Sequence, residues 1–204
     1  VGIDAGSNEL TLSQPVTVAD GTTIELYRFR QAYRPFNYDI QVRETDDLDV
    51  DATLTSGGPI SIAAAGALNV NASVNSQQDV SLFSGTTLTG NAWLSSVEGG
   101  LSLEADSVDL RGRLQVLAAP VDDSLTDISV LATNGSIQLD GGATAVNQIL
   151  LEQRGTGSVI ANNPIVTENL TVYATGLVAA TTDVRFADIE TEGDVTITEA
   201  NDVE

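Results

Sequence analysis

The chain repeats one short phrase, in which an acidic residue precedes two apolar residues that are separated by a single residue. The phrase occurs at Asp39-Ile40-Gln41-Val42, Asp79-Val80-Ser81-Leu82, Asp127-Ile128-Ser129-Val130, Asp183-Val184-Arg185-Phe186 and Asp194-Val195-Thr196-Ile197. Strict alternation places the apolar side chains on one face of a strand and the others on the opposite face. Its recurrence predicts many short strands, each with one buried face.

From Asp46 onward the strand-like phrases recur about every ten residues, a spacing typical of all-β proteins. Two or three such strands would form a coil of roughly 20 to 30 residues, which lies in the period range of stacked-repeat proteins. The aromatic content of 4% also suits a narrow aliphatic core. We therefore expect an all-β parallel β-helix (β-solenoid). The alternative is a tandem β-sandwich, which would bring longer strands and more aromatic residues in its core.

Three local features complete this prediction. The segment 145–153 fits either a helical stripe or an alternating strand, and we interpret it as a strand because strands are predicted on both sides. Gly, Asn, Ser and Asp lie between the predicted strands, so we expect corners that use left-handed backbone conformations. The stretch 120–124 is predicted to be a loop that projects from one corner.

Residues 1–45 differ from the repeats of residues 46–204, so we divide the chain there. The first part contains weakly alternating strands and a cluster of aromatic residues interleaved with arginines: Tyr27, Phe29, Tyr33, Phe36 and Tyr38, with Arg28, Arg30, Arg34 and Arg43. The five aromatic side chains are candidate ligand contacts, since such clusters stack on sugars or bases. We favour a second interpretation, an N-terminal cap that covers the open edge of the core and whose arginines pair with carboxylates.

The formal charge of −21 and the lack of certain residue types exclude several functions. Such a charge repels nucleic acid and anionic membrane surfaces, and it suits an extracellular or saline setting. Without Cys, His or Lys, the chain has no disulfide, thiolate, imidazole or Schiff-base chemistry. No signal peptide or apolar membrane span is visible, and we interpret the chain as a piece of a longer extracellular protein.

The carboxylates were tested against the patterns that metal binding and catalysis require. Asp47, Asp49 and Asp51 resemble the start of an EF-hand loop, but Ala52 and Gly58 stand where that loop needs Gly and Glu. They are expected to form the solvated face of a strand, with weak calcium binding left open and no cofactor predicted. The pairs Asp46-Asp47 and Asp122-Asp123 could serve as acid and base at a glycosidic bond. A role in turns is favoured for them, and the chain is not expected to be an enzyme.

Two phrases resemble the repeats of filamentous haemagglutinin-type adhesins and of giant, repetitive bacterial surface proteins. They are Gly193-Asp194-Val195-Thr196-Ile197-Thr198-Glu199-Ala200 and Asn134-Gly135-Ser136-Ile137-Gln138-Leu139-Asp140-Gly141-Gly142. The resemblance covers about Asp46 to the C-terminus. It implies a right-handed β-helix that serves as a stalk, adhesin or cell-envelope segment, and it supplies no catalytic residues.

The expected function is therefore that of a non-catalytic structural or adhesive segment of a large secreted or cell-surface bacterial protein. Its expected partners are surface or matrix glycans or proteins, and its ends could stack on adjoining segments. The alternative is a carbohydrate-binding or polysaccharide-cleaving β-helix module that uses the aromatic residues between Tyr27 and Tyr38.

Overall fold

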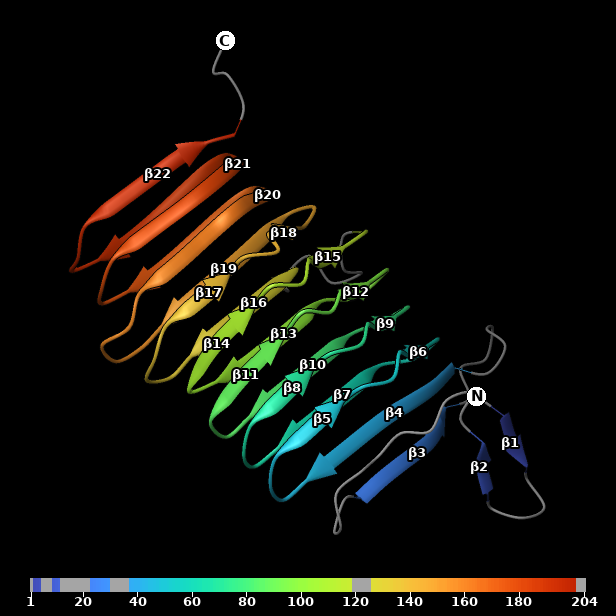
Figure 1. The fold of residues 1–204 in the computed structure, drawn as a ribbon. Coiled ribbons are helices and arrows are strands. Elements are labelled where there is room, and N and C mark those ends of the chain that lie inside the picture. Colours follow the sequence, from blue (N-terminus) through green and yellow to red (C-terminus); the bar gives the residue numbers. More distant parts are fainter. Residues whose placement is uncertain (1, 5–8, 12–22, 30–36, 119–125, 201–204) are drawn as a thin grey trace.

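The structure is a computed structural model that describes residues 2–4, 9–11, 23–29, 37–118 and 126–200, with the side chains in these ranges from Asp39 onward. The described residues form 22 β-strands and no helix. From β4 to β22 the chain winds into a parallel β-solenoid of about eight turns (Figure 1). The all-β parallel β-helix predicted from the alternation is confirmed, and the tandem β-sandwich is wrong because the ladders form one continuous, mainly parallel sheet.

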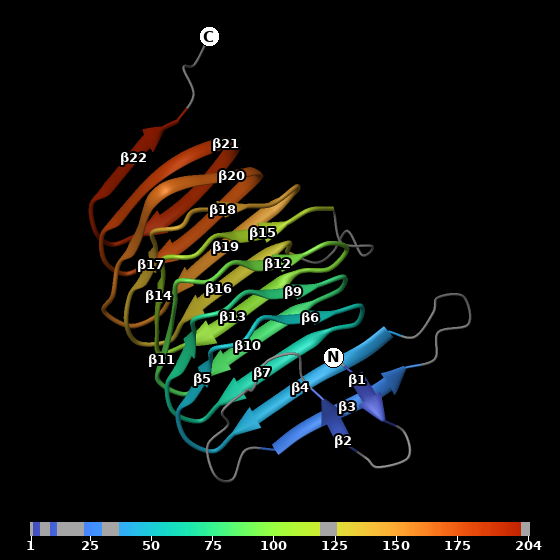
Figure 2. The ribbon, with the colours of Figure 1, turned by 45° about the vertical axis from the view of Figure 1, so that its right-hand side comes forward.

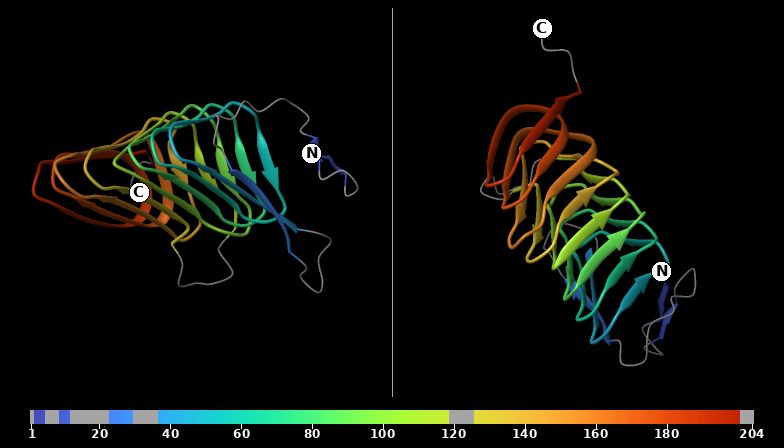
Figure 3. Two further views of the ribbon diagram at one scale, coloured as in Figure 1. Left: turned by 90° about the horizontal axis from the view of Figure 1, so that it is seen from below. Right: turned by 60° about the vertical axis from the view of Figure 1, so that its left-hand side comes forward.

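Each turn contributes one strand segment to each of three faces, and the successive turns stand on one another (Figure 3). Face 1 holds β4 (Asn37–Glu44), β7 (Ile60–Ala64), β10 (Val80–Ser84), β13 (Leu101–Ala105), β16 (Ile128–Ala132) and β19 (Gln148–Gln153). Face 2 holds β5 (Leu48–Val50), β8 (Leu68–Val70), β11 (Thr87–Gly90), β14 (Ser107–Leu110) and β17 (Ile137–Leu139). Face 3 holds β6 (Leu54–Ser56), β9 (Val74–Ser76), β12 (Leu94–Ser96), β15 (Leu114–Val116) and β18 (Ala143–Thr144).

The last turns are built from longer strands that continue around the corners. Strand β20 (Val159–Ala174) pairs in succession with β17, β18 and β19, and so contributes to all three faces. Strand β21 (Val178–Thr191) follows β20 with one register shift, and β22 (Val195–Glu199) pairs with the first part of β21. The predicted strand at 145–153 is confirmed as β19.

The N-terminal strands pair differently. Strand β3 (Thr23–Phe29) is antiparallel to β4 and occupies its outer edge, as seen at the lower end of the ladder in Figure 2. Strands β1 (Gly2–Asp4) and β2 (Glu9–Thr11) pair with each other, also antiparallel. Because β4 pairs in parallel with β7, the solenoid ladder already includes residues from the range 1–45. The loop expected at 120–124 lies outside the described residues.

The turn length agrees with the predicted coil of roughly 20 to 30 residues, but the strands follow one another more closely than predicted. Residues in direct register on neighbouring early turns lie 20 positions apart, as Asp49 and Asn69 do. Three strands share those 20 residues, so their spacing is closer than the predicted ten. Near the C-terminus the turn shortens, and Glu168 and Arg185 contact each other across 17 positions. The turns tighten because the long strands β20 and β21 pass the corners with fewer turn residues.

The core is a set of aliphatic ladders that run along the solenoid axis. Leu48, Leu68 and Leu88 stand in register on successive turns and are 3%, 0% and 0% exposed. All buried apolar side chains of the described part are Val, Ile, Leu or Ala. Each leucine buried in this way contributes about 1.5–3 kcal/mol to stability.

Most corner glycines allow the backbones of successive turns to approach closely, and few of them adopt an unusual backbone conformation. Among the described glycines, positive φ angles occur at Gly142 and Gly155. A Cβ added to Gly157 would lie 2.1 Å from the carbonyl oxygen of Gly135 on the preceding turn. One added to Gly176 would lie 2.4 Å from the carbonyl oxygen of Gly157. The expectation of left-handed corners is therefore wrong for most of these glycines, which are needed because backbones of successive turns meet there.

Candidate functional site

The aromatic cluster predicted as a ligand contact falls on the N-terminal strands. Tyr27 and Phe29 belong to β3, and Tyr38 belongs to β4, where it is paired with Arg28 of β3. Tyr33 and Phe36 lie outside the described residues, as do the side chains of all five. Beside this segment, burial raises the pKa of the Asp39 carboxyl above its usual value. The antiparallel pairing thus brings three of the five candidates to one end of the solenoid.

The carboxylates considered for metal binding link the first turn to the second. Asn69 Nδ2 donates a hydrogen bond to Asp49 Oδ1 at 2.7 Å, and Asn71 Nδ2 donates to Asp51 Oδ1 at 2.9 Å. Asp47 Oδ1 accepts from the backbone amide of Ala67 at 2.7 Å. Leu48 and Val50 point inward as predicted. These three acids therefore serve as hydrogen-bond acceptors between turns.

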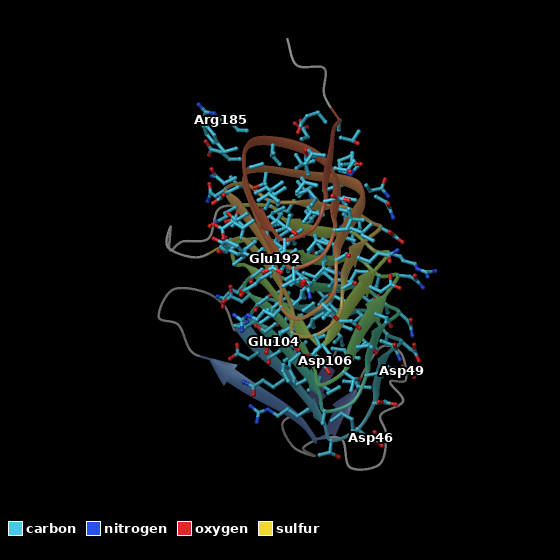
Figure 4. All side chains as sticks on the ribbon, turned by 90° about the vertical axis from the view of Figure 1, so that its left-hand side faces the viewer. Asp46, Asp49, Glu104, Asp106, Arg185 and Glu192 are labelled. Carbon is cyan, nitrogen blue, oxygen red and sulfur yellow. The ribbon has the colours of Figure 1, made fainter. Side chains whose placement is uncertain are left out.

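The acids do not gather into a site in the described part of the chain. Figure 4 shows Asp46, Asp49, Glu104, Asp106 and Glu192 spread along the solenoid. The described residues contain no group of three or more Asp, Glu, His or Cys that could hold a metal ion. The pair Asp122-Asp123 lies outside them.

Polar ladders also continue between later turns. Thr89 Oγ1 donates to Asn69 Oδ1 at 2.5 Å, which extends the contact that begins at Asp49 on face 2. On face 3, Ser95 Oγ donates to Asn75 Oδ1 at 2.8 Å. Such bonds, each worth about 1 kcal/mol, fix the register of one turn on the next.

A buried serine ladder, not anticipated from the sequence, lines the inside of face 3. Ser56, Ser76 and Ser96 follow one another in register and are 7%, 2% and 0% exposed. Ser76 Oγ accepts from the amide of Gln78 at 2.9 Å and donates to the carbonyl oxygen of Gly58 at 2.8 Å. Each hydroxyl in this position bonds to its own corner, and those of Ser76 and Ser96 also bond to the corner of the preceding turn. The 20-residue recurrence of serine is the sequence signal that could have revealed the ladder.

Two buried acids, Glu44 and Asp127, each have one carboxylate oxygen without a hydrogen-bond partner in the described structure. Asp127 is fully buried, and its Oδ2 accepts from the amide of Asn147 at 2.6 Å. Its Oδ1 is buried without a hydrogen-bond partner in the described structure. A single carboxylate with one free oxygen supplies too few ligands for a metal ion. We therefore assign Asp127 a role in the corner before β16.

Arg154 and Arg185 lie beside acids, whereas Arg113 donates a hydrogen bond to the hydroxyl of Thr144. Arg154 Nε donates to Glu152 Oε1 at 2.7 Å, and this hydrogen bond together with the charge of Glu152 raises the pKa of Arg154. Arg185 Nη1 lies 3.0 Å from Glu168 Oε1. Arg185 also stacks over the ring of Phe186, with 5.1 Å between the guanidinium carbon and the ring centroid. These contacts are exposed and offset only a small part of the negative charge.

The outer surface of face 1 carries two columns of side chains that run along the axis. The serine column is formed by Ser61, Ser81, Ser102 and Ser129, which stand in direct register. The aromatic–acidic column, two residues further along each strand, is formed by Phe83, Glu104, Leu131, Glu152, Tyr173 and Glu190. Apolar and acidic side chains alternate in it from turn to turn.

The C-terminal end of the solenoid exposes its apolar interior. Val195 and Ile197 of β22 stand in register on Val178 and Ala180, which are buried. Val195 is 50% exposed and Ile197 is 36% exposed, because the described chain places nothing over them. The inward ladder thus reaches the end of the described structure uncovered.

Comparison of the chain with protein-family models, with curated proteins and with solved structures found no match. No helix in the described part is long and apolar enough to cross a lipid bilayer. The geometry is therefore the basis of the functional argument below.

Proposed function

We propose that this chain is a non-catalytic structural and adhesive segment of a large secreted or cell-surface bacterial protein, of the filamentous haemagglutinin-like kind. The observation that carries the proposal is that polar side chains form hydrogen bonds between successive turns. Asp47, Asp49, Asp51 and the buried serines hydrogen-bond one turn to the next. Groups engaged in this way build a regular rod and are not free for acid–base chemistry.

Two further features support a role in extension and display. Face 1 is a parallel sheet that runs the length of the solenoid and turns its serine and aromatic–acidic columns outward. The uncovered ladder at Val195 and Ile197 offers a rung on which an adjoining β-coil can stack. The acidic surface keeps such a rod soluble and favours an extracellular location.

The test combines adhesion and catalysis on the whole chain. The protein is coupled through an N-terminal tag to fluorescent beads, and bead retention is measured on immobilised matrix proteins and polysaccharides. The same polysaccharides are then assayed for newly formed reducing ends. Retention above that of albumin-coated beads, without reducing ends, is expected. Reducing ends that disappear in the Asp46→Asn/Asp47→Asn variant would overturn the proposal in favour of a polysaccharide-cleaving module, and retention equal to albumin would overturn the adhesive role.

A further inference from the structure

The aromatic–acidic column presents large apolar side chains to solvent at a constant interval. Phe83 is 44% exposed and Tyr173 is 38% exposed. The buried apolar side chains of the described core, in contrast, are all aliphatic. Leu131 occupies the position midway between them, Glu104 and Glu152 occupy the turns in between, and Glu190 occupies the turn after Tyr173. Exposed aromatic side chains in register mark an interaction surface more often than scattered ones do.

The interval follows from the strand spacing. Neighbouring strands lie about 4.8 Å apart, so side chains two turns apart are separated by about 9.6 Å. Phe83 and Tyr173 are four turns apart, which corresponds to about 19 Å along the axis. A partner that uses all three apolar positions must therefore repeat about every 9.6 Å.

The charge of the surface selects a cationic partner. Three glutamates belong to the column, and Arg154 pairs with Glu152 at its side, which leaves a local charge of three minus one, or −2. The whole chain carries −21. Anionic glycans would be repelled by this surface. Lysine and arginine side chains would gain attraction at every second turn.

Among regular peptide conformations, the polyproline II helix matches the interval. It has three residues per turn and rises 3.1 Å per residue, so its side chains recur about every 9.3 Å along one face. A β-strand repeats on one face about every 6.7 Å, and an α-helix about every 5.4 Å. Over the four turns from Phe83 to Tyr173 the mismatch with polyproline II is only about 0.6 Å.

The serine column supplies hydrogen-bond donors for a ligand in this conformation. A polyproline II backbone makes no internal hydrogen bonds, so its carbonyl groups need donors from the surface on which they lie. Ser81, Ser102 and Ser129 lie on the same three strands as Phe83, Glu104 and Leu131, two residues earlier in each. Their short hydroxyl side chains leave room for a peptide beside the larger column.

We propose that the outer surface of face 1 binds a basic, proline-rich segment of a partner protein in the polyproline II conformation, aligned with the solenoid axis. Proline rings would pack against Phe83, Leu131 and Tyr173, and the arginine or lysine side chains would pair with the neighbouring Glu104 and Glu190. This proposal rests on the adhesive role proposed above and names the chemistry of the partner.

The test measures fluorescence polarisation of a labelled (Pro-Pro-Arg)4 peptide with the full chain at low and at physiological ionic strength. Two control peptides separate the requirements: (Pro-Pro-Glu)4 keeps the conformation and reverses the charge, and (Gly-Ser-Arg)4 keeps the charge without the conformation. Unlabelled cellohexaose is added as a competitor, so that binding of a glycan is an explicit outcome. Saturable binding of (Pro-Pro-Arg)4 alone, weakened by salt, is expected.

Variants locate the binding surface. Tyr173→Ser and Phe83→Ser are each expected to weaken binding by about 3- to 10-fold. The matched control is Trp93→Ser, which removes a 49% exposed ring outside the column and should leave affinity within about 2-fold. Glu104→Gln/Glu190→Gln should reduce both affinity and its salt dependence, whereas Glu192→Gln should not. Melting curves check that each variant remains folded. If a variant that lacks an aromatic ring fails to fold, the glutamine variants still test the proposal.

The proposal is overturned by any of three results. The first is equal binding of (Pro-Pro-Glu)4 or (Gly-Ser-Arg)4, and the second is equal weakening by Trp93→Ser and Tyr173→Ser. The third is absence of peptide binding, with or without binding of cellohexaose. Since the bead and reducing-end assays use other ligands, failure here leaves their outcome unchanged, and the two proposals fail separately.

Discussion

Replacement of Ser76 by alanine tests whether the buried serine ladder holds the turns together. The substitution removes the bond that Ser76 Oγ donates to the carbonyl of Gly58 and the bond that it accepts from the amide of Gln78. Each net hydrogen bond is worth about 1 kcal/mol, and a buried group left without a partner costs about 1–3 kcal/mol. We therefore expect Ser76→Ala to lower the free energy of unfolding by about 2 kcal/mol.

The matched control is Ser81→Ala, which removes the same hydroxyl from the exposed serine column of face 1 and should change stability by less than about 0.5 kcal/mol. Urea unfolding followed by far-ultraviolet circular dichroism gives the midpoint and slope for both variants. Hydrogen exchange measured by mass spectrometry then shows where protection is lost. The amides near Gly58 and Gln78 should exchange faster in Ser76→Ala.

Equal stability of the two variants would refute this reasoning, because it would mean that the inter-turn bonds of the buried hydroxyl contribute nothing beyond those of an exposed serine. Loss of protection confined to residues far from these two corners would refute it as well. The ladder itself indicates why the effect should be moderate: the position that follows Ser96 on the next turn is Val116, so a fourth turn folds without this bond.

Three further outcomes are expected. Gly157→Val should destabilise the chain by about 1–3 kcal/mol or more in urea unfolding, since even its Cβ would lie 2.1 Å from the carbonyl oxygen of Gly135, and wild-type stability in the variant would contradict the close approach of the corners. The melting temperature should rise when salt is increased from 0.01 to 0.15 M, which shortens the screening length from about 30 to 8 Å and weakens repulsion within a chain of charge −21; a fall would disprove this account. Because burial raises the pKa of Asp39, the folded state binds that proton more tightly and the ionised carboxylate lowers stability at higher pH. Asp39→Asn should thus be more stable than wild type at neutral pH, with a difference that disappears as the pH falls below the ordinary value of 3.8, and a difference that grows on acidification would exclude the proposed sign.

Alternation predicted most of the strands and their buried faces, because burial on one side of a strand is a local property of the sequence. The prediction was wrong for Phe186, which is paired with Asn169 and is 57% exposed. Val80 and Leu82 point into the core of β10, as their spacing indicated. The buried serines were missed because alternation was judged from apolar residues. Ser76 lies two residues after Val74 and so points to the same inner face of its strand. A single serine at such a position does not indicate burial; only its recurrence on neighbouring turns does.

The columns on face 1 could not be predicted from the sequence for a different reason. Their members come from separate turns, and the spacing between equivalent residues changes along the chain. Phe83 and Glu104 are in register across β10 and β13, whereas Glu104 and Leu131 are in register although the loop before β16 lengthens that turn. Only the strand pairing shows which residue of one turn stands on which residue of the next.

The direction of the hydrogen bonds between strands has a mechanical consequence. In the solenoid these bonds, and the side-chain bonds from Asn69 to Asp49 and from Ser76 to Gly58, point along the long axis. Tension applied between the two ends would break the hydrogen bonds of one turn before those of the next. It would not shear many strands at the same time. The rod should yield by peeling off single turns at modest force and recover when slack returns, because each remaining turn still presents a complete edge for the next.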